Sequence, residues 1–176
     1  MSDAFEARGE LSPAMNPEQP QTPVDASAFA ALGLAPELVS AVADLGYSQP
    51  TAVQARVIPL ASPAASGGRY ADLMVSSQTG SGKTAAFLLP VLHTLLGQQA
   101  ERAAAERAER ERQAAEALAR GETPAKAPKR KDPTNPRHFK AATPGALVLC
   151  PTRELAQQVA HDAIELVRHC RGLRIA

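Results

Sequence analysis

The first apolar pattern in the chain predicts a short amphipathic helix. It opens with Pro36, a residue suited to the first turn of a helix, and its apolar positions recur at helical spacing as Leu38, Val39, Val42 and Leu45. Gly46 stands where a left-handed residue commonly ends a helix. The chain then restarts at Pro50, and Thr51 is a suitable N-cap for a second short helix that should end at Pro59.

Farther along, buried strands and helices are expected to alternate. Residues 72–76, with Leu73, Met74 and Val75 at their centre, and the apolar run over residues 146–150 predict short buried strands, and residues 173–176 begin a third. Residues 82–96 predict a core helix kinked at Pro90, and Thr152 caps another helix through about residue 169, whose inner side carries Leu155, Val159, Leu166 and Val167. This order predicts an α/β fold with a doubly wound parallel sheet. Because such sheets rarely stop at three strands, we expect the chain to be the truncated front part of a longer protein.

Two further regions differ from the expected core. Residues 1–24 hold four prolines among polar residues and are predicted to be a disordered tail, so that the domain covers residues 25–176. Residues 98–143 interrupt the fold as an insertion. Its first half is rich in Ala, Glu and Arg, with Glu106–Arg110 and Glu116–Arg120 at four-residue spacing, and predicts a solvated helix ended by Gly121. Its second half, residues 124–140, carries six cations against Asp132 and predicts a basic loop.

Composition narrows the choice of function classes. The chain has 176 residues, is 44% apolar and 21% charged, and carries a net charge of +1. This balance excludes wholly disordered proteins and binders that depend on bulk positive charge. No apolar run approaches the roughly 20 residues that span a bilayer, and no secretory signal is evident, so a cytoplasmic location without a membrane is expected. Cys150 and Cys170 lack metal-binding spacing and are interpreted as packing residues.

The strongest chemical signal lies between the first strand and the core helix. Residues 76–84 read Ser-Ser-Gln-Thr-Gly-Ser-Gly-Lys-Thr, a P-loop in which Ser77 replaces the usual first glycine. Gly80 and Gly82 let the backbone wrap a phosphate, and the helix N-terminus supplies donors and positive potential. Lys83 would reach the terminal phosphates, and Thr84 would hold Mg²⁺ through its hydroxyl. The pattern predicts an ATP and Mg²⁺ site whose phosphate cradle consists of Ser77, Gln78, Thr79, Gly80, Ser81, Gly82, Lys83 and Thr84.

Two more motifs occur in the order found in one protein family. Residues 46–54 read Gly-Tyr-Ser-Gln-Pro-Thr-Ala-Val-Gln, like the Q motif of that family, with Phe29 seventeen residues ahead; residues 151–157 read Pro-Thr-Arg-Glu-Leu-Ala-Gln, like its RNA-binding motif. With the P-loop between them, residues 29–175 resemble the first, RecA-like domain of the DEAD-box ATP-dependent RNA helicases of superfamily 2. In that family the first P-loop position is usually Ala, so Ser77 is a small-for-small departure.

The resemblance implies roles for residues outside the P-loop. Gln54 would pair with adenine N6 and N7 and so select ATP over GTP, with Tyr47 in the same cofactor-binding set. Phe29 would stack on the adenine ring, although a core position under a helix is the alternative. The RNA-binding residues would be Pro151, Thr152, Arg153 and Glu154, contacting phosphate from a helix that opens outside a strand end. Without the family, Thr152 could equally be an ordinary helix cap.

The hydrolytic residues of the family are missing from the sequence. Its D-E-A-D box, its S-A-T motif and its second RecA-like domain are absent, and the acids after the P-loop and outside the insertion are Glu154, Asp162 and Glu165, all on one expected helix. The parent protein is therefore expected to be an ATP-dependent RNA helicase that couples ATP hydrolysis to local duplex unwinding, with this chain alone inactive. The alternatives are a non-catalytic ATP- and RNA-binding module and another kind of P-loop protein, which the Q motif argues against.

Overall fold

The computed structural model describes residues 26–62, 72–121 and 143–176 of the chain. The predicted tail at residues 1–24 and the predicted basic loop at residues 124–140 lie outside these ranges. Within them the fold consists of five helices, α1 Ser27–Ala30, α2 Pro36–Asp44, α3 Ala52–Ala61, α4 Lys83–Ala119 and α5 Arg153–Leu166. None of these helices is long and apolar enough to cross a membrane.

The two short helices expected before the P-loop are present. α2 has Pro36 in its first turn, and Gly46 follows it with a φ of +79°, the left-handed conformation predicted for it. α3 begins after Thr51, whose hydroxyl accepts a hydrogen bond from the backbone N–H of Gln54 at 3.3 Å. The predicted end of α3 at Pro59 is wrong, because the helix continues through Pro59 to Ala61. A proline removes one backbone N–H donor, and the loss of one hydrogen bond near the end of a helix does not prevent the helix from continuing for another two residues.

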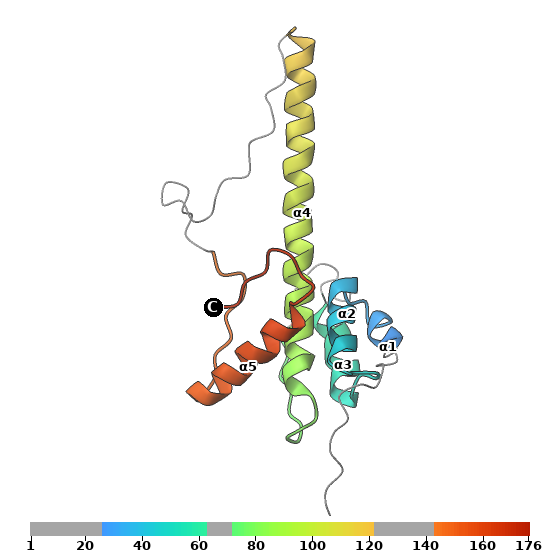
Figure 1. The fold of residues 1–176 in the computed structure, drawn as a ribbon, viewed down its shortest axis with the longest axis vertical. Helices are drawn as coiled ribbons and strands as arrows, with labels where there is room; N and C mark the ends of the chain where they lie inside the picture. The colour runs from blue at the N-terminus through green and yellow to red at the C-terminus, as the bar shows by residue number, and fades with distance from the viewer. Residues whose placement is uncertain (1–25, 63–71, 122–142) are drawn as a thin grey trace, which may run out of the picture.

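One helix replaces the two that the sequence predicted after the P-loop. α4 runs for 37 residues, through both Pro90 and Gly97, and Figure 1 shows it as a continuous rod whose upper half projects beyond the other helices. The Ala, Glu and Arg residues after Gly97 are strong helix formers, which explains why one glycine does not end the helix. Gly121, with a φ of +76°, follows the C-cap as predicted.

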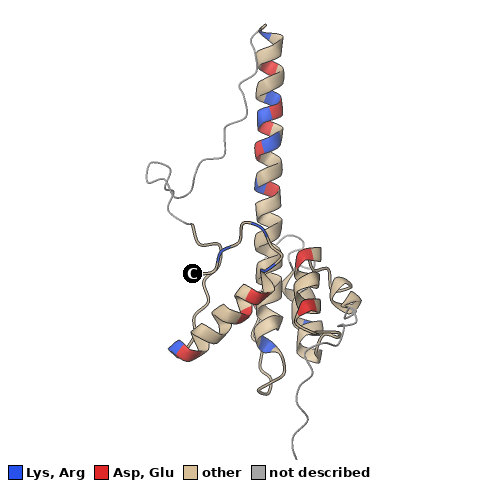
Figure 2. Ribbon diagram, in the orientation of Figure 1, with Lys and Arg blue, Asp and Glu red and all other residues tan. Residues whose placement is uncertain are grey.

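The projecting half of α4 is exposed and laced with ion pairs. Figure 2 shows its positive and negative residues interspersed along the rod. Arg110 pairs with Glu106 at 3.2 Å and Arg120 with Glu116 at 3.7 Å, as the four-residue spacing predicted. Each such pair contributes about 0.2–0.5 kcal/mol to the helix. Glu109 accepts hydrogen bonds from Gln113 and Arg112, which lower the pKa of its carboxyl group below the ordinary value.

The predicted strands do not form in this chain. Residues 72–76, 146–150 and 173–176 belong to no strand of the described structure. Parallel strands are stable only when neighbouring strands bond to their N–H and C=O groups, and no backbone hydrogen bond joins these three segments to one another or to the other described residues. The doubly wound parallel sheet is therefore not present in the described residues, and this described part of the chain is mainly helical.

The core forms around the lower half of α4. The largest fully buried side chains come from all five helices and are Phe29, Leu38, Val42, Ile58, Leu89 and Leu166. α3 packs against one side of α4 and α5 crosses it on another, as Figure 1 shows. Cys150 and Cys170 are free and pack against this core, consistent with the packing role expected for them.

Polar contacts fix α2 against its neighbours. The backbone N–H of Ala35, the N-cap of α2, donates to Nδ1 of His93 in α4 at 3.1 Å. At the other end of α2, Asp44 accepts from Nε2 of His169, just after α5, at 2.7 Å. These two contacts attach both ends of α2 to its neighbours, and they thereby fix the start of the segment that leads from α2 into α3.

Candidate nucleotide-binding site

The P-loop sequence folds as a loop that leads directly into α4. Gly80 and Gly82 have φ values of +76° and +82°, in a backbone region that residues with a Cβ rarely adopt. Gly82 is the N-cap of α4, and no side chain caps this helix, so the first N–H groups of α4 remain available to an anion. The glycines thus occupy the positions where the predicted phosphate cradle needs them.

Lys83 lies across the loop that precedes it. Its Nζ donates to the backbone carbonyls of Ser77, at 2.7 Å, and of Gln78. The hydroxyls of Ser77 and Ser81 are hydrogen-bonded to each other, closing the loop from within. Carbonyl oxygens carry partial negative charge, so they accept hydrogen bonds from the Lys83 ammonium group as phosphate oxygens would. A bound triphosphate would compete with these contacts for the ammonium group.

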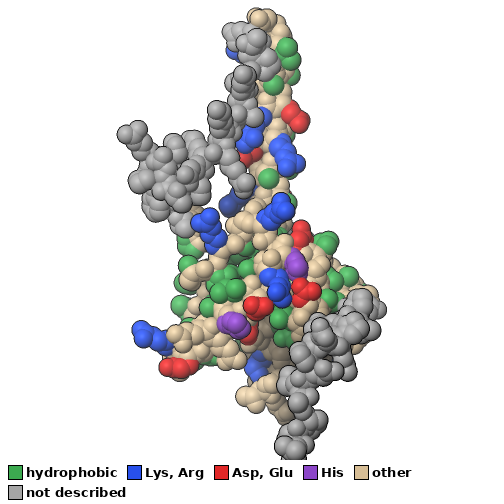
Figure 3. Space-filling view, viewed as in Figure 1, with side chains coloured by type: hydrophobic (Ala, Val, Ile, Leu, Met, Phe, Trp, Pro, Cys, Tyr) green, Lys and Arg blue, Asp and Glu red, His purple; other side chains and the backbone are tan. Residues whose placement is uncertain are grey.

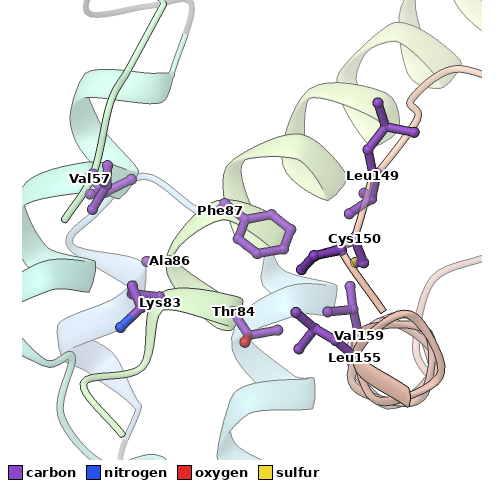
Figure 4. A pocket seen from close by; sticks show the side chains of 12 residues that line it. Val57, Lys83, Thr84, Ala86, Phe87, Leu149, Cys150, Leu155 and Val159 are labelled. Atoms are coloured by element: carbon purple, nitrogen blue, oxygen red, sulfur yellow. The ribbon is translucent and has the colours of Figure 1, made fainter. Parts of the chain in front are cut away.

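A cavity of about 320 Å³ lies beside Lys83 and Thr84. Figure 4 shows the Thr84 side chain facing the residues that the second expected strand and α5 contribute, among them Leu149, Cys150, Leu155 and Val159. Its lining is mostly apolar and includes no Asp or Glu. Among the residues that the structure describes, no cluster of His, Cys, Asp and Glu could hold a metal ion. The Thr84 hydroxyl therefore fits Mg²⁺ only as one ligand beside phosphate oxygens and water.

α3 contributes two side chains that hold the P-loop. The Thr51 hydroxyl donates to the carbonyl of Ser81 at 2.8 Å, and Nε2 of Gln54 donates to the carbonyl of Gly82 at 3.2 Å. Gln54 also accepts from the backbone N–H of Thr51 at 3.0 Å, which completes a capping box. A Cβ added to Gly82 would lie 2.5 Å from Nε2 of Gln54, so this approach requires glycine.

This arrangement bears on the expected adenine contact of Gln54. The side chain is 4% exposed, and both ends of its amide are bonded within the protein. Pairing with adenine would require the amide to exchange these partners, so the adenine role stays a prediction. Sequence reasoning missed the contact of Thr51 and Gln54 with the P-loop, because it joins residues about thirty positions apart.

The two aromatic residues expected near the nucleotide differ in exposure. Tyr47 is 42% exposed just after α2 and is accessible to a ligand. The side chain of Phe29 is completely buried, packed with core residues of the other helices. This matches the core position that the sequence left open as an alternative. Stacking on adenine would require the ring to leave the core, and it stays a prediction.

The residues expected to contact RNA lie at the N-terminus of α5. Thr152 is its N-cap and accepts from the backbone N–H of Leu155 at 3.2 Å. Pro151, Arg153 and Glu154 are exposed around it. Thr152 is thus a helix cap in this structure, and the four residues form an open surface near the cavity beside Thr84, because Pro151 also lines that cavity.

Comparison with known proteins identifies a family. The sequence model described as DEAD/DEAH box helicase matches residues 51–176. The chain is 33% identical over 150 residues to the ATP-dependent RNA helicase mak5 of Aspergillus terreus, covering 85% of this chain and 15% of that protein. It is 38% identical over 142 residues to the ATP-dependent RNA helicase SrmB of Haemophilus influenzae, covering 81% and 22%. It is also 34% identical over 147 residues to the ATP-dependent RNA helicase DeaD of Klebsiella pneumoniae, covering 84% and 15%. The chain therefore spans less than a quarter of the length of these relatives.

Proposed function

The chain belongs to the DEAD/DEAH box helicase family, and from this membership we propose that it forms the nucleotide-binding part of an ATP-dependent RNA helicase. In this proposal the full protein couples ATP hydrolysis to local unwinding of RNA, through a RecA-like domain of which the chain is the first part, residues 25–176. The observation that carries the proposal is the start of α4 at Gly82, which no side chain caps, directly behind a loop in which Gly80 and Gly82 have left-handed backbone conformations.

The chain's own residues would bind the triphosphate in a defined way. Backbone N–H groups of residues 79–84 would surround the phosphates at the positive end of α4. Lys83 would leave the carbonyls of Ser77 and Gln78 and pair with the terminal phosphates, a charge-assisted contact that is stronger than a contact to a neutral carbonyl. The Thr84 hydroxyl would hold Mg²⁺, which neutralises phosphate charge when it is bound.

The residues at the start of α5 support a nucleic-acid role. We place Pro151, Thr152, Arg153 and Glu154 at the RNA backbone, because Arg153 is an exposed cation and the first turn of α5 offers backbone N–H groups to phosphate. Replacement of Arg153 by Ala should weaken RNA binding with a reduced dependence on salt. Arg174 offers a matched control, because it is an exposed arginine outside the motif.

A specific observation also favours the second candidate, a binding module without catalytic activity. No carboxylate lines the cavity beside Lys83 and Thr84, and hydrolysis needs a group that orients the attacking water. Under this proposal the chain, taken by itself, binds ADP and ATP and does not turn ATP over in the presence of RNA. The catalytic residues would lie in the rest of the protein.

The deciding experiment titrates ATP, ADP and GTP into the 176-residue chain and into Lys83→Ala, and measures phosphate release with and without single-stranded RNA. We expect nucleotide binding that Lys83→Ala weakens for all three nucleotides alike, because the phosphates are common to them. Equal affinity in the variant would contradict the P-loop assignment. Turnover by the chain that disappears in Lys83→Ala would contradict only the assignment of catalysis to the rest of the protein.

A further inference from the structure

The Ser77 hydroxyl bridges the two sides of the P-loop. Its Oγ lies 2.5 Å from Oγ of Ser81, four residues later, so the two hydroxyls are hydrogen-bonded. Both side chains are partly buried, whereas the residues between them, Gln78, Thr79 and Gly80, are exposed. On the face that Figure 3 shows, the loop lies at the lower end of α4 as polar side chains and backbone open to solvent. The bond therefore closes the base of a loop whose tip is open.

The backbone of the loop does little to maintain this shape. Within the described residues, no backbone N–H of residues 77–82 donates to a backbone carbonyl. Gly80, between the two serines, adds a position of wide backbone freedom. The Thr51 hydroxyl holds the carbonyl of Ser81, on the side of the loop next to α4. The opposite side, which begins at Ser77, is held by side chains of the loop and of the first turn of α4.

Two side chains hold Ser77, and one of them is needed elsewhere when a nucleotide binds. Lys83 donates to the Ser77 carbonyl at 2.7 Å and reaches the Ser77 hydroxyl at 3.5 Å, and under the proposed function it leaves these groups for the phosphates. The bond between the Ser77 and Ser81 hydroxyls uses neither Lys83 nor a backbone N–H group. It is therefore compatible with a phosphate on the N–H groups of the loop, and it continues to join the two sides.

We propose that Ser77 is a positioning residue, which keeps the phosphate loop in its binding shape through its hydrogen bond to the Ser81 hydroxyl. This inference rests on the proposed function, because it concerns the same phosphate site. A loop that already has its bound shape loses less conformational freedom when the ligand binds, and so it binds more tightly. The general P-loop pattern has glycine at the position of Ser77, and glycine has no side chain that could form this bond.

A double-mutant cycle measures the contribution of the two hydroxyls. Ser77→Ala and Ser81→Ala should each weaken the binding of ATP, ADP and GTP by about two- to tenfold, the range expected for one hydrogen bond. The double variant should bind no more weakly than either single variant, because all three lack the same bond. Ser77→Thr keeps a hydroxyl and should retain the affinity of the unchanged chain. Calorimetry with the 176-residue chain compares these proteins.

Two further measurements isolate the shape of the loop. Inorganic tripolyphosphate has phosphates and no base, so Ser77→Ala should weaken its binding by the same factor as the binding of ATP. Ser40→Ala is the matched control, because it also removes a hydrogen-bonded serine hydroxyl, which donates to the carbonyl of Pro36 in α2, outside the P-loop. This control should leave every affinity unchanged. Matching circular dichroism spectra would show that the variants keep the helical fold.

The outcomes distinguish this inference from the proposed function. Additive losses in the double variant would show that the two hydroxyls contact phosphate independently. Unchanged or tighter binding by Ser77→Ala would show that the bond does not support the bound shape. Either result would overturn the inference and leave the nucleotide site in place. Absence of nucleotide binding by the unchanged chain would contradict the proposed function, and the inference with it.

Discussion

Gln54 in α3 donates a hydrogen bond from Nε2 to the backbone carbonyl of Gly82, the N-cap of α4, at 3.2 Å. Its Oε1 accepts from the backbone N–H of Thr51, so one amide caps α3 and holds the start of α4. The side chain is almost completely buried, and a buried amide that loses its partners costs free energy. Gln54 thereby ties the shape of the phosphate loop to the position of α3.

This relationship predicts two separable effects of Gln54→Ala. Loss of the capping box and of the bond to Gly82 should lower the free energy of unfolding by about 0.5–2 kcal/mol. It should also weaken binding of every nucleotide, because the loop is less well ordered. An adenine contact would add a loss of discrimination between ATP and GTP, worth about 1–3 kcal/mol for a bidentate pair. Thermal unfolding and titration with both nucleotides measure the two effects.

The control for Gln54→Ala is Thr51→Val, which removes the bond to Ser81 and the cap without approaching a base. We expect it to weaken ATP and GTP by the same factor. If Gln54→Ala also leaves the ratio of ATP to GTP affinity unchanged, the adenine role of Gln54 is excluded and its function is to position the loop.

Local signals explain why the helices could be predicted from the sequence. Pro36 and Gly46 bound α2, and Thr51 and Thr152 begin α3 and α5, because caps act within four residues of the chain. The C-terminal ends of two helices were predicted less well: α3 was expected to end at Pro59 and ends at Ala61, and α5 was expected to reach about residue 169 and ends at Leu166. The last turn of a helix depends on what packs against it. The continuity of α4 through Gly97 was missed because a change from apolar to charged composition was interpreted as a boundary.

Contacts between distant residues explain what the sequence could not predict. The apolar run at residues 146–150 has the pattern of a buried strand, but a strand forms only when neighbouring strands complete its hydrogen-bond ladder, and the described residues supply none. The P-loop glycines were predictable because their spacing is local. The hydrogen bond from Gln54 to the Gly82 carbonyl was not predictable, because it depends on how α3 lies against α4.

We predict that His93 stabilises the chain through the N-terminus of α2. Its Nδ1 accepts from the backbone N–H of Ala35, 58 residues earlier. His93→Leu would leave this partly buried N–H without an acceptor and should lower the free energy of unfolding by about 1–3 kcal/mol. His93→Asn should restore part of the loss, because its Oδ1 occupies a similar place. Urea denaturation compares the three proteins, and equal stability of the Leu and Asn variants would show that packing alone accounts for the effect.

The thiol of Cys170 should react slowly near neutral pH. Burial raises the pKa of this thiol above its ordinary value, and the negative charge of Glu37 adds to the shift. Folding therefore favours the protonated thiol; this contribution to stability is complete below the pKa of the unfolded chain and is lost as pH rises through the pKa of the folded chain. In Cys150→Ser, the alkylation rate of Cys170 plotted against pH should have its midpoint above that of an unfolded peptide. Glu37→Gln should lower that midpoint, and a midpoint at or below the peptide value would contradict the prediction.

The insertion is predicted to be separable from the nucleotide site. The sequence placed it at residues 98–143, but Gln98 lines a second cavity, of about 520 Å³, along α4, and Gln99 lies against Gly172. The replacement therefore begins at Ala100. Connections between core elements usually need 2–6 residues, and this one is far longer. Replacing residues 100–143 by a short Gly-Ser linker should leave ATP and ADP affinity unchanged, as measured by calorimetry. A large loss of nucleotide affinity would show that the segment supports the site.

The same replacement decides between an RNA tether and a plain spacer. The projecting half of α4 balances its charges, whereas the six cations of residues 124–140 face a single acid. If all six engaged single-stranded RNA, they would contribute a slope of roughly −4 in log K against log salt, and a chain that engages half of them would contribute about −2. Fluorescence anisotropy with a labelled RNA at about 50 and 200 mM salt measures this contribution in the intact and shortened chains. A tether predicts that the intact chain binds more tightly at low salt and loses this advantage at high salt, because its cations act by releasing counterions. Identical affinities and slopes would leave the segment as a spacer, and the RNA contact would then rest on Arg153 and its neighbours at the start of α5.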